Sequence, residues 1–328
     1  MILSLEAIRS FTTGAELVKE EEGATHFYRF TEAELQTNAN PNRTYAAGVT
    51  LRFRTDATEI TLAGFPESLT GVRSYYALEV LVNGTRRGAI RNFTEADVYG
   101  SYAERQYPLD GFEGTVSLGT GEKTVTVVLP HSVRTTLTRI ELKGATHASP
   151  LPPRPALIAY GDSITQGYDA LYPSETYAYR LAEALGCTLV NKALGGATFL
   201  PALAKAENGR DAGTVLVAYG TNDWGHLSRE SLIKNATGFL DALETHYPTS
   251  SILVLSPIWR GDSDRVTLFG SFASVSEALH SICEGRARVR FIEGVDLVPH
   301  EEAYFGDLRL HPSGAGFAAY TENLLARL

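Results

Sequence analysis

Four short apolar runs in the second half of the chain restrict its fold more than any other feature. They read ALIAYGD at 156–162, CTLVNKA at 187–193, GTVLVAYG at 213–220 and SSILVLSPIW at 250–259. Runs of this kind are typical of strands buried on both faces, as in parallel sheets. Stretches with a helical pattern lie between and after them, at 175–186, 228–247, 275–285 and 312–328. Alternating strands and helices predict a right-handed, doubly wound α/β domain.

The first half has a different pattern. Apolar and polar residues alternate at 48–56, 74–84 and 122–130, which is typical of strands with one buried face. Turn signals separate these stretches, among them Asn83–Gly84 and Asp110–Gly111. Residues 1–148 are therefore expected to form an antiparallel, all-β sandwich of jelly-roll-like type. A proline-rich stretch at 147–155 reads as a stiff linker, which places the second domain at 155–328.

Small and polar residues gather where the predicted strands of the second domain end. They read GDSIT at 161–165, NKALGGAT at 191–198, YGTND at 219–223 and SPIWRGD at 256–262, and DLRLHPS at 307–313 precedes the last helix. Ligands of open α/β sheets bind at the carboxyl ends of the strands. Together these segments predict one pocket.

Ser163 is the candidate nucleophile in this pocket. A serine needs a base to take its proton, and the base needs a partner that orients it. His311 is the candidate base and Asp307 its candidate partner. Taken one at a time, these residues favour a simpler interpretation: a turn or helix-capping serine, a helix-capping histidine and a solvated loop carboxylate.

The same chemistry needs donors for the oxyanion that forms during acyl transfer. Asn222 offers a side-chain amide, Gly196 offers an unobstructed backbone N–H, and the N–H of Ser163 is a third donor. There are simpler alternatives to a role as oxyanion donors. Asn222 could form an Asx turn, and Gly196 could serve only as a loop position with positive φ.

These blocks, in this order, resemble the SGNH hydrolases, also called GDSL esterases or lipases. GDSIT is similar to the nucleophile block, Gly-Ala-Thr at 196–198 to the glycine block, GTND to the Gly-x-Asn-Asp block and His311–Pro312 to the base block. The resemblance covers residues 155–328 and implies a flavodoxin-like, three-layer domain. It also implies that Ser163 is the nucleophile, that Ser163, Gly196 and Asn222 form the oxyanion hole, and that His311 is the base. No metal or organic cofactor is expected.

One spacing departs from this family. Its triad Asp usually stands three residues before the His, where this chain has Leu308, and Asp307 stands four before. Either the loop is one residue longer, or a backbone carbonyl orients His311. Asp162 and Asp223 are expected to bond to loops near the site.

Three further residues are candidates for substrate binding. Trp224 and Trp259 follow two strand ends and could line the pocket, and Arg260 could meet a polar substrate group. Packing in the core is the alternative for both tryptophans.

Charge and composition exclude other classes. The net charge of −9 argues against nucleic acid and anionic membranes as partners. Cys187 and Cys283 stand in no metal-binding spacing and read as reduced thiols. The segment MILSLEAIRSFTTG is a poor signal peptide and no apolar run is long enough to span a membrane, so we expect a cytoplasmic protein.

The first domain resembles the sandwich of two-domain carbohydrate esterases in class only. It could bind carbohydrate, cover the site or form a homo-oligomer. The candidate sugar-stacking side chains are Tyr75, Tyr76, Tyr99, Tyr102 and Tyr107.

The resulting hypothesis is a serine esterase that forms an acyl-enzyme on Ser163. By analogy with the family, it deacetylates a carbohydrate or a related small molecule. An acyltransferase with the same acyl-enzyme is the first alternative, and a glycan-binding protein without activity is the second.

Overall fold

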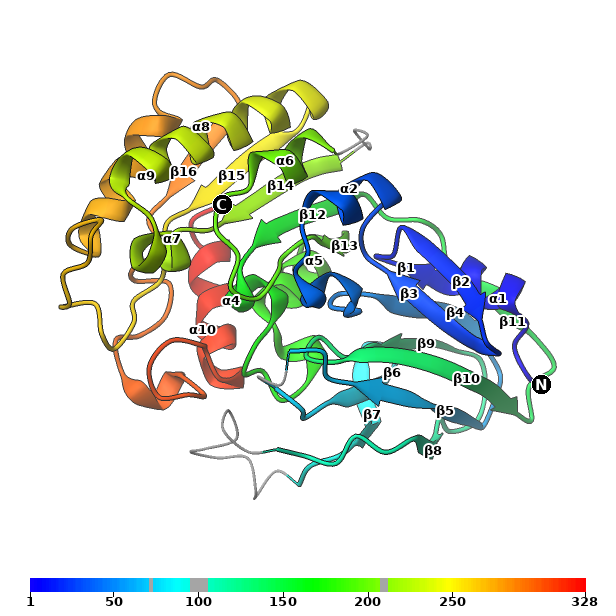
Figure 1. Cartoon of the computed structure of the whole chain (residues 1–328). Coiled ribbons are helices and arrows are strands. Elements are labelled where there is room, and N and C mark those ends of the chain that lie inside the picture. Colours follow the sequence, from blue (N-terminus) through cyan, green and yellow to red (C-terminus); the bar gives the residue numbers. More distant parts are fainter. Residues whose placement is uncertain (71–72, 95–105, 207–211) are drawn as a thin grey trace. The chain divides into compact units, whose positions relative to one another are not determined.

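The computed structural model describes residues 1–70, 73–94, 106–206 and 212–328 of the 328-residue chain (Figure 1). These residues divide into two compact units. The first comprises Met1–Phe30, Pro41–Arg154 and Leu171–Ser174, and the second comprises Thr31–Asn40, Pro155–Ala170 and Glu175–Leu328. Each unit therefore takes one short segment from the other half of the sequence.

The first unit is a sandwich of two antiparallel sheets, as the alternating pattern predicts. One sheet has the order β1-β4-β9-β6-β7 with β11 paired to β4, and the other has the order β2-β3-β10-β5-β8. The strands are β1 (Thr12–Thr13), β2 (Leu17–Glu21), β3 (Ala24–Tyr28), β4 (Thr50–Thr55), β5 (Glu59–Glu67), β6 (Ala77–Val82), β7 (Thr85–Arg91), β8 (Phe112–Ser117), β9 (Lys123–Val128), β10 (Arg134–Lys143) and β11 (Ala148–Pro150). A short helix α1 (Leu5–Phe11) and a 3-10 turn η1 (Pro41–Thr44) complete it.

The core of the sandwich lies between its two sheets. Leu51 and Val127 from one sheet and Ile60 and Leu62 from the other are fully buried in one cluster. Asn83–Gly84 forms the tight β6–β7 turn, in which both residues have positive φ (50° and 81°). This geometry suits Asn-Gly because neither residue is strongly penalised there.

The proline-rich stretch begins as a strand. Ala148–Pro150 forms β11 and pairs with β4 in the first sheet. Proline is tolerated in a strand at the edge of a sheet, where its missing N–H is not needed by a second neighbour.

The second unit holds a parallel sheet with the order β13-β12-β14-β15-β16. Its strands are β12 (Ala156–Gly161), β13 (Thr188–Asn191), β14 (Ala212–Ala218), β15 (Ser251–Leu255) and β16 (Val289–Ile292). In chain order this is 2-1-3-4-5, the flavodoxin-like arrangement. The predicted fold class is confirmed for both units.

Helices cover this sheet (Figure 1). Helix α8 packs on both α6 and α9, and α5 packs on α10. The helices are α2 (Glu32–Thr37), α4 (Ser163–Gln166), α5 (Tyr177–Ala184), α6 (Pro201–Lys205), α7 (Thr221–His226), α8 (Arg229–His246), α9 (Ala273–Cys283) and α10 (Gly314–Leu325), with 3-10 turns η2 (Pro173–Glu175, which straddles the two units) and η3 (Glu302–Tyr304). The helices expected at 175–186, 228–247, 275–285 and 312–328 correspond to α5, α8, α9 and α10.

Strand β16 is absent from the sequence-based prediction. It is short, it lies at the sheet edge, and only Ile292 in it is buried. An edge strand with so little buried surface lacks the apolar run that identifies β12, β14 and β15.

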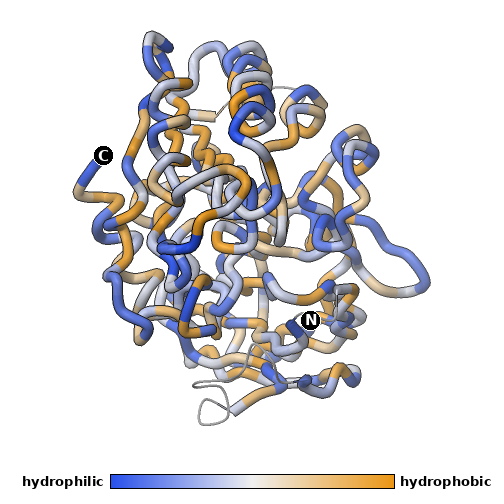
Figure 2. Tube along the Cα trace, turned by 60° about the vertical axis from the view of Figure 1, so that its left-hand side comes forward, coloured by the Kyte–Doolittle hydropathy of each residue, from blue (hydrophilic) through white to orange (hydrophobic). Residues whose placement is uncertain are grey.

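In the described residues, no helix is long and apolar enough to cross a membrane. Figure 2 shows hydrophobic residues in short stretches that hydrophilic residues interrupt. The cytoplasmic location stays a prediction.

Candidate active site

Ser163 is placed by a tight turn between β12 and α4. Asp162 caps the helix, and its Oδ1 accepts a hydrogen bond from the N–H of Ile164 at 2.9 Å. Gly161 permits the turn, because a Cβ there would lie 2.2 Å from Oγ1 of Thr165. Ser163 therefore stands at the carboxyl edge of the sheet, 5% exposed, as the first residue of the helix.

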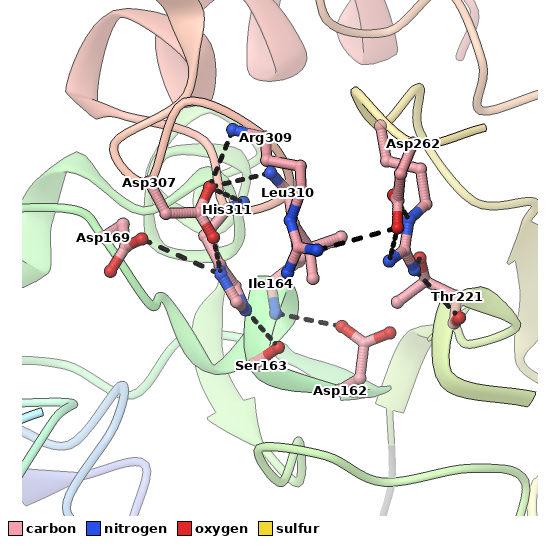
Figure 3. A network of polar contacts seen from close by, with 11 residues as sticks. Asp162, Ser163, Ile164, Asp169, Thr221, Asp262, Asp307, Arg309, Leu310 and His311 are labelled. Atoms are coloured by element: carbon pink, nitrogen blue, oxygen red, sulfur yellow. Dashed lines mark hydrogen bonds and ion pairs between the residues drawn. The ribbon is translucent and has the colours of Figure 1, made fainter. Parts of the chain in front are cut away.

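The Ser163 hydroxyl is hydrogen-bonded to His311. Its Oγ lies 2.8 Å from Nε2 of the imidazole, and Nδ1 of the same ring lies 2.7 Å from Oδ2 of Asp307 (Figure 3). Hydroxyl, imidazole and carboxylate thus form one continuous chain. In such a chain the imidazole can take the hydroxyl proton while the carboxylate stabilises the resulting cation.

The loop from Asp307 to His311 explains how a four-residue spacing reaches the ring. Oδ1 of Asp307 accepts hydrogen bonds from the backbone N–H groups of Arg309 (3.1 Å), Leu310 (2.7 Å) and His311 (3.0 Å). Leu308 has a φ of 59°, an uncommon conformation for a leucine. The left-handed residue curls the longer loop around the carboxylate, so Oδ2 remains directed at Nδ1.

The same contacts fix the charge of Asp307. Burial alone would raise the pKa of this carboxyl. The hydrogen bond and positive charge of His311, with the N–H groups of Leu310 and His311, outweigh burial and hold the pKa well below its usual range. Asp307 is therefore ionised at neutral pH.

A second carboxyl faces the same imidazole nitrogen. Oδ2 of Asp169 lies 3.8 Å from Nδ1 of His311 (Figure 3), and Asp169 is 1% exposed. It stands just after α4 with a φ of 71°, and the ring of its neighbour Tyr168 lies 5.7 Å from the imidazole. Sequence reasoning missed Asp169, since neither periodicity nor a motif marks it.

The glycine loop, residues 193–198, comes shortly after β13. The N–H of Ala197 bonds to the carbonyl of Leu194, and Gly196 in the turn has a φ of 76°. The N–H of Gly195 donates to Oε1 of Gln166 at 2.7 Å. Gly196 is exposed, and its N–H has no hydrogen-bond partner among the residues that the structure describes. Of the two glycine N–H groups, that of Gly196 is available to a ligand.

Asn222 lies at the start of α7, after Gly220, whose φ is 119°. Its Nδ2 donates to the carbonyl of Ala197 at 3.0 Å. This bond ties the amide to the glycine loop and leaves its second N–H to point elsewhere.

Two buried carboxyls support these loops. Asp162 caps α4, and burial raises its pKa to about 6 against the lowering effects of the Ile164 N–H and of His311 and Arg260. Asp223 accepts from the N–H of Phe199 at 3.2 Å, and burial raises its pKa to about 7.

The predicted substrate contact of Trp224 is wrong. Its side chain is fully buried, and its Nε1 donates to the carbonyl of Gly270 at 3.0 Å, so no face of the ring is open to a ligand. The residues next to Trp224 in the sequence do not predict that the loop around Gly270 covers its ring.

The guanidinium of Arg260 is also bonded to other protein groups. It is 6% exposed, and its Nε and Nη2 bind the two oxygens of Asp262 at 2.5 and 3.1 Å, while Nη1 reaches Thr221 at 3.3 Å. These bonds hold the loop after β15, so the predicted contact with substrate is wrong here too. Trp259 is partly exposed and stacks on His300, so its role stays a prediction.

The tyrosines proposed for sugar stacking divide into three groups. Tyr75 and Tyr76 are buried in the core of the first unit, so neither offers a face to a sugar. Tyr107 is partly exposed. Tyr99 and Tyr102 lie outside the described residues.

One group of side chains has the geometry of metal ligands. The ligand atoms of Asp169, Asp307 and His311 lie within 4.8 Å of one another. A metal bound there would displace the hydrogen bond between Nδ1 and Asp307, because the same nitrogen would have to be a ligand.

Comparisons with known proteins agree with this fold. Residues 159–319 match the model of the GDSL-like lipase/acylhydrolase family. Among curated proteins, none matches the chain.

Solved structures match over nearly the whole chain at low identity. A salicylyl-acyltransferase, SsfX3, of a tetracycline biosynthetic pathway has 19% identity and a TM-score of 0.77 over 95% of this chain and 92% of its own. A Bacteroides ovatus protein assigned to the GDSL-like lipases has 18% identity and a TM-score of 0.76 over 100% and 96%. The acetyl xylan esterase Est2A of the rumen bacterium Butyrivibrio proteoclasticus has 16% identity and a TM-score of 0.59 over 87% and 90%.

Proposed function

We propose that the chain is a serine hydrolase of short-chain carboxylic esters. The match of residues 159–319 to the GDSL-like lipase/acylhydrolase family supports this proposal. One observation carries the proposal: the unbroken chain from Ser163 Oγ through His311 to the ionised Asp307, with contacts of 2.8 and 2.7 Å. These groups activate a hydroxyl for attack on a carbonyl carbon.

The reaction follows from this geometry. Ser163 Oγ bonds to the ester carbonyl carbon while its proton passes to Nε2 of His311. The tetrahedral intermediate then loses the alcohol, which takes that proton from the imidazole. Water attacks the acyl-enzyme, His311 takes a proton from it, and the acid leaves as the proton returns to Ser163.

The negative charge of the intermediate needs donors that already point at it. The proposed set is the N–H of Ser163, the N–H of Gly196 and the second N–H of the Asn222 amide. Within the described part of the chain the N–H of Gly196 has no partner, whereas that of Gly195 is bound to Gln166; this difference supports the choice of Gly196.

We assign catalysis to residues 155–328 and a carbohydrate-binding, covering or oligomer-forming role to the sandwich of residues 1–148. The proposed substrate is an acetyl ester of a carbohydrate or a related small molecule. The structural similarity to an acetyl xylan esterase supports this choice.

An acyltransferase is the second candidate. It is favoured by the similarity to a salicylyl-acyltransferase, whose TM-score of 0.77 exceeds that of the acetyl xylan esterase. The same acyl-enzyme would pass its acyl group to an alcohol in place of water. Product analysis in the presence of candidate alcohols separates the two, because a transferase forms the new ester faster than the free acid.

The test is hydrolysis of p-nitrophenyl esters from acetate to octanoate by the wild type and Ser163→Ala. Ser271→Ala is the matched control, since Ser271 is an exposed serine of the same domain. We expect activity that falls steeply beyond butyrate, is lost in Ser163→Ala and is kept in the control. Equal activity in all three proteins would refute the nucleophile and favour a glycan-binding protein without activity.

A further inference from the structure

A segment from the first half of the sequence is built into the second unit. Residues 31–40 hold α2, which begins with a capping box: Oγ1 of Thr31 accepts from the N–H of Glu34, and the Glu34 carboxylate accepts from the N–H of Thr31. Such a cap fixes where a short helix begins. The capping box therefore fixes the start of α2 at Thr31.

The first of these contacts is a buried ion pair. Oε2 of Glu34 lies 2.6 Å from Nζ of Lys192, and both side chains are fully buried. Lys192 directly follows β13 and precedes the glycine loop. Leaving either charge buried without its partner would be costly, so the two side chains stay paired. The pair therefore anchors α2 to the base of this loop.

The second contact lies at the other end of the segment. Oδ1 of Asn38 accepts from the N–H of Asn40 at 2.7 Å, an Asx turn that orients Asn40. Nδ2 of Asn40 then donates to the carbonyl oxygen of Gly195 at 2.8 Å. These two residues are 155 positions apart in the sequence.

The bond to Gly195 controls a group that the proposed reaction uses. The carbonyl of Gly195 and the N–H of Gly196 belong to one planar trans peptide, in which the two groups point in opposite directions. Glycine tolerates many backbone conformations, so a Gly-Gly peptide does not hold its own orientation. Gln166 fixes the preceding peptide through the N–H of Gly195, and Asn40 fixes this one.

We infer that Asn40 is a positioning residue of the oxyanion hole: by holding the Gly195 carbonyl it aims the Gly196 N–H at the developing oxyanion. The inference rests on the proposed esterase function. Asn40 acts more strongly on the transition state than on bound substrate, because the oxyanion exists only after attack.

The test compares Asn40→Ala and Asn40→Asp with the wild type. Asn40→Asp keeps the size of the side chain but has no N–H to donate, so it separates the hydrogen bond from packing. Gln36→Ala is the control, because it removes an exposed amide from the same segment, residues 31–40. The readouts are kcat and KM for p-nitrophenyl acetate, the thermal midpoint, and the Ki of trifluoroacetone. This ketone bonds to Oγ of Ser163 as the proton passes to His311, which leaves a tetrahedral oxyanion.

We expect kcat to fall about 10- to 100-fold in both Asn40 variants, less than the 10²–10³-fold typical for loss of an oxyanion donor. The Ki of trifluoroacetone should rise by a similar factor, with KM and the thermal midpoint near wild-type values and Gln36→Ala unchanged. A role in packing alone predicts that Asn40→Asp keeps wild-type kcat and Ki, which would overturn the inference.

Failure of the proposed function looks different. A wild type that neither hydrolyses the ester nor binds trifluoroacetone refutes the esterase itself and the inference with it. An active wild type whose kcat and Ki survive both Asn40 substitutions refutes the role of Asn40 alone.

Discussion

Asp307→Asn tests the triad most sharply, because the loop dictates how the new amide must lie. Three backbone N–H groups converge on Oδ1, from Arg309, Leu310 and His311. The amide oxygen of Asn must take that place, since an NH₂ group there would face three donors. Its nitrogen then faces Nδ1 of His311, which must become an acceptor. The proton moves to Nε2, and the imidazole can no longer take the proton of Ser163.

The size of the effect follows from these bonds. Turning the amide around would give up three hydrogen bonds, about 1 kcal/mol each. The neutral amide also loses a charge-assisted hydrogen bond to the imidazolium, worth about 1.5–3 kcal/mol. The sum is about 5 kcal/mol, so kcat should fall about 10³- to 10⁴-fold at 1.36 kcal/mol per factor of ten. This agrees with the loss of about 10⁴ for the equivalent change in a serine protease triad.

The assay is steady-state hydrolysis of p-nitrophenyl acetate, with thermal unfolding measured on the same samples. Asp307→Asn should unfold within a few degrees of the wild type, whereas Asp307→Ala should unfold earlier because the three N–H groups lose their acceptor. Activity of Asp307→Asn within tenfold of the wild type would refute the reasoning. It would move the orienting role to Asp169, whose Oδ2 lies 3.8 Å from Nδ1.

Three other substitutions test the surroundings of the site. Gly196→Ala should lower the free energy of unfolding in urea by about 1–2 kcal/mol. The space around a Cβ there is open, but a φ of 76° strains any residue that has one, so an unchanged urea midpoint would contradict this prediction. Glu34→Gln should cost about 3–5 kcal/mol by leaving Lys192 buried without its counter-charge, and a loss below 1 kcal/mol would refute the buried pair. Burial raises the pKa of Asp223 to about 7, so the folded state keeps a proton that the unfolded chain releases near pH 4, and stability falls as the pH rises between them. Asp223→Asn should remove this dependence, so its stability relative to the wild type should increase from pH 4 to 7 in pH-dependent urea unfolding; a constant difference would contradict it.

The features that the sequence predicts are those carried by local patterns. The buried run that becomes β12 and the alternating stretch that becomes β4 each show their environment in their own residues. The strand β16 does not, because the edge of a sheet demands little apolar surface. The same limit applies to α2, whose membership of the second unit depends on the pairing of Glu34 with Lys192 and on the bond from Asn40.

The candidate site divides in the same way. Ser163, His311 and Asp307 could be proposed together because each stands beside a recognisable block, and the structure brings them into contact. The contact of Asp307 with His311, four residues later, depends on the left-handed conformation of Leu308, which no sequence motif predicts. The position of Trp224 after a strand leaves pocket lining and core packing both open, and the loop that buries its ring comes from a distant part of the chain.

The central claim is a covalent acyl-enzyme on Ser163, and trapping it is the most direct measurement. The wild type is mixed with p-nitrophenyl acetate, quenched in acid within one turnover and digested for mass spectrometry, with Ser163→Ala treated in parallel. The account predicts an acetyl group on Ser163 in the wild type, formed as fast as p-nitrophenol is released. Turnover by the wild type without this adduct, or equal turnover by Ser163→Ala, would contradict it.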